Sequence, residues 1–159
     1  MTITNLQKLE KTVNSELASK VQKSIIEHNE LLIHINAADL VYVVQFLKSN
    51  DFFKFRQLID IAGVDYPEDD KRFQLVYLLL SHEYNFRIKL MIKFQIDQSI
   101  SSITKIFPSA NWMEREVFDM YGIDFKNHPD LRRILTDYGF EGHPLRKDFP
   151  LTGHTEVRY

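Results

Sequence analysis

The fold follows from FQLVYLLLSHEYNFRIKLMIKFQI at residues 73–96. The first half of this stretch is a nearly continuous apolar run. The second half, RIKLMIKF at 87–94, alternates between apolar and basic side chains except at Met91. Such alternation is typical of a strand with one face in the core and the other toward solvent. Because EYN at 83–85 separates the halves as a turn, the stretch predicts two neighbouring strands with one buried face.

Two further β-rich runs precede this stretch. FRQLIDIAGVDY at 55–66 is followed by the turn PEDDKR at 67–72, and ELLIHI at 30–35 reads as another strand. These runs predict a sheet, and the short turns between the later strands favour antiparallel pairing.

Apolar spacing and capping residues predict helices around these strands. The first helix carries apolar residues three or four positions apart at Leu6, Leu9, Val13, Leu17 and Val21. Asn36 is placed to cap a helix at 37–49, 101–106 forms a short helical turn, and Asn111 caps a helix at 112–121 that Gly122 ends. We therefore expect an α+β fold with a mostly antiparallel sheet covered by helices on one face.

The end of the chain differs in its content of glycine and proline. Residues 122–159 hold four of the five glycines and three of the five prolines, which break regular elements. They also keep apolar residues that a disordered tail lacks, among them Leu131, Ile134, Phe140 and Phe149. We expect an α+β body at 1–121 and an extended arm at 122–159 that lies on its own body or on a partner.

Composition excludes several classes of function. With 159 residues and 18.9 kDa the chain fits one domain, and its net charge of −2 lacks the basic excess of a nucleic-acid binder. No cysteine is present, which excludes thiolate ligands, disulfides and a thiol nucleophile. The longest uncharged stretch, Phe73–His82, is far shorter than the roughly 20 residues that span a bilayer. No secretory or transit signal is recognised at the start of the chain.

Three groups of polar residues are candidates for a site. On the helix at 112–121, Glu116 and Asp119 share a face, and two such carboxylates could serve acid/base chemistry or bind a metal. The favoured interpretation is that this ionic helix face docks onto a neighbour. His128, His143 and His154 with Asp130, Asp137 and Asp148 have the ligand types of a zinc site, although their spacing matches no compact motif and turn corners are favoured. The basic pairs at 132–133 and 146–147 suit interface carboxylates better than phosphate, because nearby acids neutralise them.

The run EREVFDMYGIDFKNHPDLRRIL at 114–135 resembles the 30 kDa subunit, known in bacteria as NuoC, of the proton-pumping NADH:quinone oxidoreductase, respiratory complex I. The continuation TDYGFEGHPLRKDFPLTG is similar to the mitochondrial and alphaproteobacterial form of that family. The residues that carry the resemblance or adjoin it, and that it marks as an interface, are Glu114, Arg115, Glu116, Asp119, Met120, Tyr121, His128, Pro129, Arg132 and Arg133.

The resemblance implies a structural subunit. Members of the family hold no catalytic, cofactor-binding or metal-binding residues, and FMN and the iron–sulfur clusters lie in partner subunits. The chain would dock on the large hydrogenase-like (49 kDa-type) subunit near the quinone site, with its arm wrapped around partners. It would be peripheral on the matrix side of the mitochondrial inner membrane, or on the cytoplasmic side of a bacterial one. The NADH:ubiquinone reductase and proton-translocating activity would belong to the assembly.

Within this interpretation, Arg115, Asp119, Arg132 and Arg133 are expected to fix the helix and the following loop to the large subunit. Two alternatives remain open. The chain is an equivalent subunit of a related machine, the photosynthetic dehydrogenase-like complex or a membrane hydrogenase, or, remotely, a free-standing metallohydrolase that uses His128, His143 and Asp148.

Overall fold

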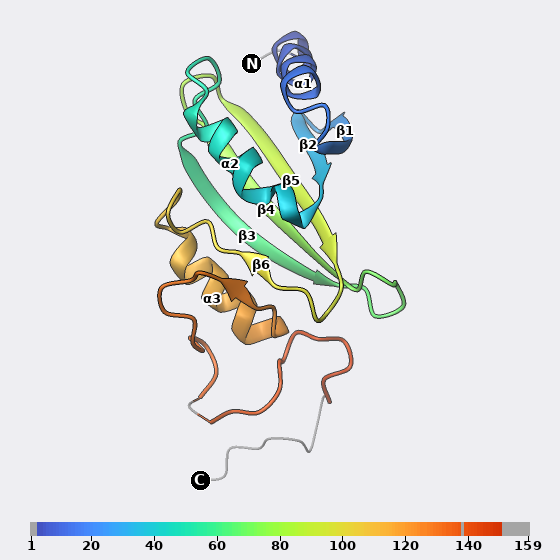
Figure 1. The fold of residues 1–159 in the computed structure, drawn as a ribbon, viewed down its shortest axis with the longest axis vertical. Coiled ribbons are helices and arrows are strands. Elements are labelled where there is room, and N and C mark those ends of the chain that lie inside the picture. Colours follow the sequence, from blue (N-terminus) through green and yellow to red (C-terminus); the bar gives the residue numbers. More distant parts are fainter. Residues whose placement is uncertain (1–2, 138, 151–159) are drawn as a thin grey trace.

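The computed structural model describes residues 3–137 and 139–150 and has a five-stranded sheet with three α-helices (Figure 1). In chain order the elements are α1 (Ile3–Glu16), β1 (Val21–Glu27), β2 (Glu30–Ile35), the short 3₁₀ helix η1 (Ala37–Asp39), α2 (Leu40–Ser49), β3 (Gln57–Asp65), β4 (Phe73–Ser81), β5 (Phe86–Phe94), β6 (Ile100–Ser101), α3 (Ala110–Tyr121) and β7 (Phe125–Lys126). The strand order of the large sheet is β1-β2-β5-β4-β3, and only the β2–β5 pair is parallel. The predicted α+β class with a mostly antiparallel sheet is confirmed.

One face of the sheet forms the core. In β5 the side chains of Ile88, Leu90 and Ile92 are fully buried, whereas Lys89 and Met91 between them are half-buried and the flanking Arg87 and Lys93 are exposed. Their partners on β4 alternate in step, because Tyr77 faces Leu90 across the antiparallel pair. The period of two that predicted this face is therefore confirmed.

The helices pack on that buried face. Helix α2 lies over the sheet in Figure 1 and buries Leu40, Val43, Val44 and Leu47. In the described ranges, 3–137 and 139–150, no helix combines the length and the apolar character needed to cross a membrane.

Helix α3 is held against the edge strand β3 by a close approach at Gly63. The Tyr121 ring lies so near that a Cβ at position 63 would be 2.7 Å from it, and the Tyr121 hydroxyl donates to the Gly63 carbonyl at 2.9 Å. Only glycine leaves room for this contact. The contact fixes where the C-terminal end of α3, and whatever is attached to it, lies relative to the sheet.

The prediction was wrong at the first helix and the first strand. Helix α1 ends at Glu16, and Val21 begins strand β1, so the helical spacing from Leu17 to Val21 is coincidental. Strand β1 was missed because it is an edge strand whose side chains are all exposed or half-buried, which leaves little alternation in VQKSIIE.

Both predicted caps were also wrong. Asn36 makes no capping bond; its side chain accepts a hydrogen bond from Gln22 on β1, and η1 precedes α2. Asn111 lies inside α3, which begins at Ala110. Ser101, assigned to a helical turn, pairs in β6 with β7, so the first residues of the predicted arm add a small parallel sheet to the body.

Candidate interface on helix α3 and the C-terminal arm

Helix α3 carries charged side chains into the interior. Glu114 and Asp119 are fully buried and Arg115 is 9% exposed, while Glu116 is exposed. Because a buried charge is costly unless it is paired and hydrogen-bonded, each of the three needs specific partners. The partners come from residues 102–103 and from the loop at 130–136.

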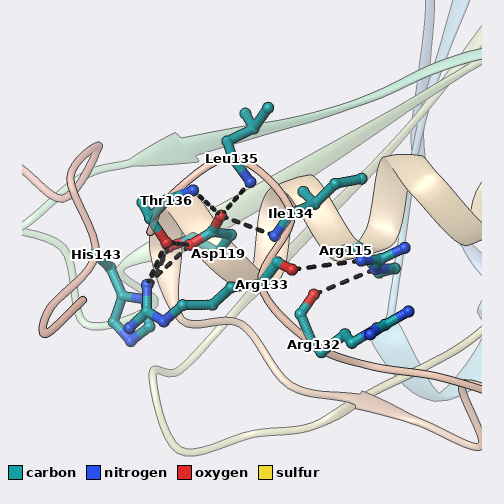
Figure 2. A network of polar contacts seen from close by, with 8 residues as sticks. All are labelled: Arg115, Asp119, Arg132, Arg133, Ile134, Leu135, Thr136 and His143. Atoms are coloured by element: carbon teal, nitrogen blue, oxygen red, sulfur yellow. Dashed lines mark hydrogen bonds and ion pairs between the residues drawn. The ribbon is translucent and has the colours of Figure 1, made fainter. Parts of the chain in front are cut away.

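Asp119 binds the loop that follows His128 (Figure 2). One carboxylate oxygen accepts the backbone N–H groups of Ile134, Leu135 and Thr136 at 3.1, 2.7 and 2.9 Å. The other oxygen accepts the Thr136 hydroxyl at 2.6 Å and an Arg133 guanidinium N–H at 2.8 Å. The aspartate therefore fixes the conformation of three consecutive peptides.

These donors determine the charge state of Asp119. Burial opposes ionisation, but the hydroxyl and N–H of Thr136, the Leu135 N–H and the Arg133 guanidinium outweigh it and hold the pKa of the carboxyl well below its usual range. Asp119 is therefore an anion under all ordinary conditions.

Arg115 holds the same loop one helical turn earlier. Its guanidinium donates to the carbonyl oxygens of Arg132 and Arg133 at 3.2 and 3.3 Å, and it lies 5.1 Å from the centre of the Trp112 ring. Residues four apart share a helix face, so Arg115 and Asp119 together clamp the loop along α3. Arg115 and Asp119 were expected to fix the helix and the following loop to the large subunit. The groups that the pair holds in the structure belong to this chain, and a contact with a partner stays a prediction.

The arm also completes the end of α3. The last carbonyl groups of a helix have no partner within it. Here the Asp119 carbonyl contacts His143 Nδ1 at 3.0 Å, the Met120 carbonyl accepts the Leu145 N–H at 3.0 Å, and the Tyr121 carbonyl accepts the Arg146 guanidinium at 2.6 Å. Gly122 ends the helix in the left-handed conformation at φ 77°. The arm is thus bonded to the helix at successive carbonyls.

Glu114 is bonded in a different direction. It accepts the Ser102 hydroxyl at 2.6 Å and the Ile103 N–H at 2.9 Å, which ties α3 to the segment after β6. Burial raises the pKa of Glu114, opposed by these two bonds and by His128, whose Nε2 lies 3.9 Å away. The His128 Nε2 contacts the Asn111 carbonyl at 3.0 Å and its Nδ1 accepts the Asp130 N–H at 3.0 Å, so the ring joins the start of α3 to the loop after it.

A second clamp was not predicted from the sequence. Asp65, at the end of β3, is paired with Arg72 through two bonds of 2.6 and 2.8 Å and accepts the Lys147 N–H at 2.8 Å. Arg72 also contacts Asp148 at 3.1 Å. The only sequence signal was the local balance of acids and bases in the arm, which does not identify partners about eighty positions earlier.

The candidate zinc ligands are not brought together. His128 is bonded to the first turn of α3, and His143 to its last turn. Among the described residues no group of three histidine, aspartate or glutamate side chains is arranged to hold a metal ion. His154 lies outside the described residues. The separate positions of His128 and His143 do not favour the metallohydrolase alternative.

The network leaves other side chains exposed beside it. Trp112 is 66% exposed, Leu135 is 62% exposed and Leu145 is 52% exposed. The Arg132 side chain is 70% exposed with Asp130 as its ion-pair partner at 3.0 Å, and Pro129 is exposed as well. Met120 and Tyr121 instead pack inward. We call Trp112, Arg132, Leu135 and Leu145 the α3 surface.

Known proteins resemble this chain over nearly its whole length. Residues 33–155 match the family model described as respiratory-chain NADH dehydrogenase, 30 Kd subunit. A subunit of the NADH-quinone oxidoreductase of Mesorhizobium japonicum is 48% identical over 98% of this chain and 77% of its own length. The NADH dehydrogenase [ubiquinone] iron-sulfur protein 3 of Patellifolia webbiana is 53% identical over 93% of this chain and 76% of its own length.

A solved structure has the same fold. A chain in the structure of the membrane-bound sulfane sulfur reductase (MBS), an archaeal respiratory membrane complex, superposes with a TM-score of 0.79. The match covers 92% of this chain and 86% of that one, at 22% identity. At this level of identity the likeness concerns the fold alone.

Proposed function

Because the chain belongs to the 30 kDa subunit family of respiratory-chain NADH dehydrogenase, complex I, we propose that it is a structural subunit of the peripheral arm of that enzyme. NADH:quinone reduction and proton translocation are then activities of the assembly. FMN and the iron–sulfur clusters are held by partner subunits. The name of the Patellifolia relative contains "iron-sulfur protein", yet this chain has no cysteine to supply the usual thiolate ligands.

The docking site in this proposal is the α3 surface, and its partner is the large hydrogenase-like subunit near the quinone site. The observation that carries the proposal is an exposed tryptophan and arginine held beside a rigid network. Trp112 stacks with the Arg115 guanidinium, and Arg132 belongs to the loop that Asp119 and Arg115 clamp. Tryptophan and arginine are enriched among the residues that dominate protein interfaces, and a surface ordered in advance loses little entropy on binding.

The expected role is support of assembly. The chain attaches to the membrane-bound enzyme through its partners, on the matrix side of the inner membrane or the cytoplasmic side of a bacterial membrane. The side chains that hold the loop and the arm to α3 form an interface network of Glu114, Arg115, Asp119, Arg133 and His143. Each is hydrogen-bonded within this chain, which supports a structural role.

The experiment is replacement of Arg132 in the cell. Arg132→Glu should leave the fold intact, because the side chain is exposed, but should oppose carboxylates of the partner and reduce the amount of assembled complex. The matched control is Arg56→Glu, another exposed arginine next to an acid, Asp51, on a different surface. Native gel electrophoresis of membranes with NADH:quinone reductase activity measures assembly and turnover separately. Fully assembled but inactive complex in Arg132→Glu would contradict the proposal.

A second candidate is the equivalent subunit of a related membrane complex. The fold shared with a chain in the structure of the archaeal MBS complex supports this second candidate. Purification of the complex through this chain, followed by assay with NADH as the electron donor, separates the two candidates. Quinone reduction by NADH is expected, and reduction only by another donor favours the related machine.

A further inference from the structure

The face of the large sheet that points away from the helices is not polar throughout. An antiparallel sheet with a solvated face normally carries polar side chains there. Among the described residues, this face is exposed or half-buried except at Gln74. Met91 on β5, the residue that breaks the alternation of RIKLMIKF, lies at its centre and is half-buried.

Met91 belongs to a set of apolar side chains on this face that is interrupted between β2 and β5, where Met91 pairs with His34 and Leu32 pairs with Lys89. Met91 faces Val76 on β4, which in turn faces Ala62 on β3. On the same face but toward the β1 edge of the sheet, Leu32 on β2 faces Ile25 on β1, which is 40% exposed. The set also includes Leu78, which follows Val76 on the same face of β4. The six residues of this set, which we call the β stripe, are Ile25, Leu32, Ala62, Val76, Leu78 and Met91.

Basic side chains border the β stripe. Lys89 and Lys93 lie on either side of Met91 on β5, and Lys23 lies at the β1 edge. Lys89 is paired with Glu30 at 3.1 Å, Lys93 lies 3.9 Å from Asp69, and Asp60 is the acid on the β3 side. Burial together with the charges of Lys23 and Lys93 lowers the pKa of His34, which faces Met91. The charged side chains that act on His34, opposite Met91, are therefore basic, while Glu30, Asp69 and Asp60 lie beside the lysines or at the border of the face.

We propose that the β stripe docks a segment of a neighbouring subunit that presents apolar side chains edged by carboxylates. Apolar surface gathered on one face of a soluble domain marks an interaction site, and a basic border is complemented by acidic groups. Five strands about 4.8 Å apart span about 19 Å from first to last, which matches roughly 13 residues of an α-helix. The site adjoins the α3 surface only at the β3 edge, where Ala62 and Leu145 line the same pocket, and Met91 lies two strands away from that edge.

The test places a photoreactive amino acid at position 91 of the full chain in its native membranes. Irradiation precedes any purification, and the crosslinked peptides are sequenced by mass spectrometry. The expected product is a peptide of another subunit with apolar residues and at least two aspartates or glutamates. Crosslinks only to lipid, only to a second copy of this chain, or to no other chain overturn the proposal.

Two variants whose charge changes are equal in size and opposite in sign test the electrostatic part. Lys93→Glu should lower the crosslink yield about tenfold, because it puts a like charge opposite the partner's carboxylates. Asp60→Lys on the same face should leave the yield unchanged or higher. Equal yields in both variants overturn the acidic partner. Arg132→Glu distinguishes this site from the proposed function: loss of assembly in that variant concerns the α3 surface, whereas crosslinking at position 91 in the unaltered chain tests the β stripe by itself.

Discussion

Asp119 concentrates more interactions than any other side chain of the interface network. It accepts five hydrogen bonds, from Arg133, from the backbone of Ile134 and Leu135, and from both the backbone and the hydroxyl of Thr136. Carboxylates accept strong, short bonds of this kind from N–H groups that water would otherwise solvate. A single residue therefore decides whether the loop at 133–136 is ordered.

Asp119→Asn tests this concentration. Asparagine keeps the shape but loses the charge and turns one acceptor into a donor, so buried N–H groups lose their partner. We expect a loss of about 2–3 kcal/mol in the free energy of unfolding, measured by urea denaturation at pH 7. Because the folded pKa lies below the unfolded one, this stabilisation is present above about pH 4 and disappears as the pH falls through the folded pKa.

The control for Asp119 is Glu116→Gln on the same helix. Glu116 is exposed, and the change should stay within about 0.5 kcal/mol. Equal losses in both variants would contradict a special role for Asp119.

The Glu114 carboxyl changes stability with pH in the direction opposite to Asp119, and Glu114→Gln removes this dependence. Burial raises the pKa of Glu114 in the folded chain, so ionisation costs more there than in the unfolded chain. The wild type should lose stability relative to Glu114→Gln as the pH rises above about 4.3, until the raised pKa is passed. Unfolding free energies of both proteins from pH 4 to 7 measure this. A difference that does not change with pH would show that the folded and unfolded pKa values are equal.

At the scale of elements, the end of α3 depends on Gly122. The residue has φ 77°, and a Cβ there would lie 2.6 Å from the His143 ring and 2.7 Å from the Arg146 guanidinium. The glycine is required both by its backbone conformation and by the arm that passes over it. The helix and the arm are thus fitted to each other at this point.

Gly122→Ala and Gly139→Ala separate these two requirements. Gly139 has nearly the same φ, 79°, but a Cβ there meets nothing within 4 Å. Each variant should lose about 1–2 kcal/mol from the left-handed backbone. Gly122→Ala should lose about 1–3 kcal/mol more, because His143 and Arg146 must move. Chemical denaturation of both proteins gives the comparison, and equal losses would mean that the arm adapts freely.

The sequence predicted those elements that carry their own pattern. Strand β5 was found because its buried face recurs with a period of two, and β2, β3 and β4 were found because they are runs rich in apolar and β-forming residues. Strand β1 has no buried face, and β6 has two residues, so neither has a period to read. The cap at Asn36 failed because Gln22, distant in sequence, binds its side chain, and sequence patterns do not record such competition.

The same limit applies to the site. The spacing of Arg115 and Asp119 on one helix face was readable, and in the structure both side chains bind the loop at 132–136 of this chain. Which groups they bind was not readable, because the loop returns to the helix only through the tertiary fold. That they also contact a partner subunit stays a prediction.

Across the molecule, Asp65 and Arg72 join the sheet to the C-terminal arm. Asp65 ends β3, Arg72 precedes β4, and both bind residues 147–148 of the arm. The Arg72 hydrogen bonds outweigh burial and lower the pKa of Asp65, so a charged pair holds the arm to the body.

Arg72→Met should release this end of the arm. It leaves the buried carboxylate of Asp65 without its guanidinium, for which a loss of about 3–5 kcal/mol is expected. Hydrogen exchange at the Lys147 amide should accelerate, because its acceptor is no longer fixed. Lys71→Met, at an exposed neighbour, serves as the control. Unchanged protection of Lys147 in Arg72→Met would show that the arm is held without this pair.

The one parallel pair of the large sheet, β2 with β5, affects when the chain can fold during synthesis. Strand β2 pairs with β5, so β2 has no partner on that side until Ile88, which lies opposite Leu31, has been translated. At about 5–20 residues per second this is a delay of several seconds. During that time the apolar faces of α1, β2 and α2 have no sheet to cover. We expect the nascent chain to rely on chaperones over this interval, and a ribosome pausing between β2 and β5 to lower the yield of soluble protein.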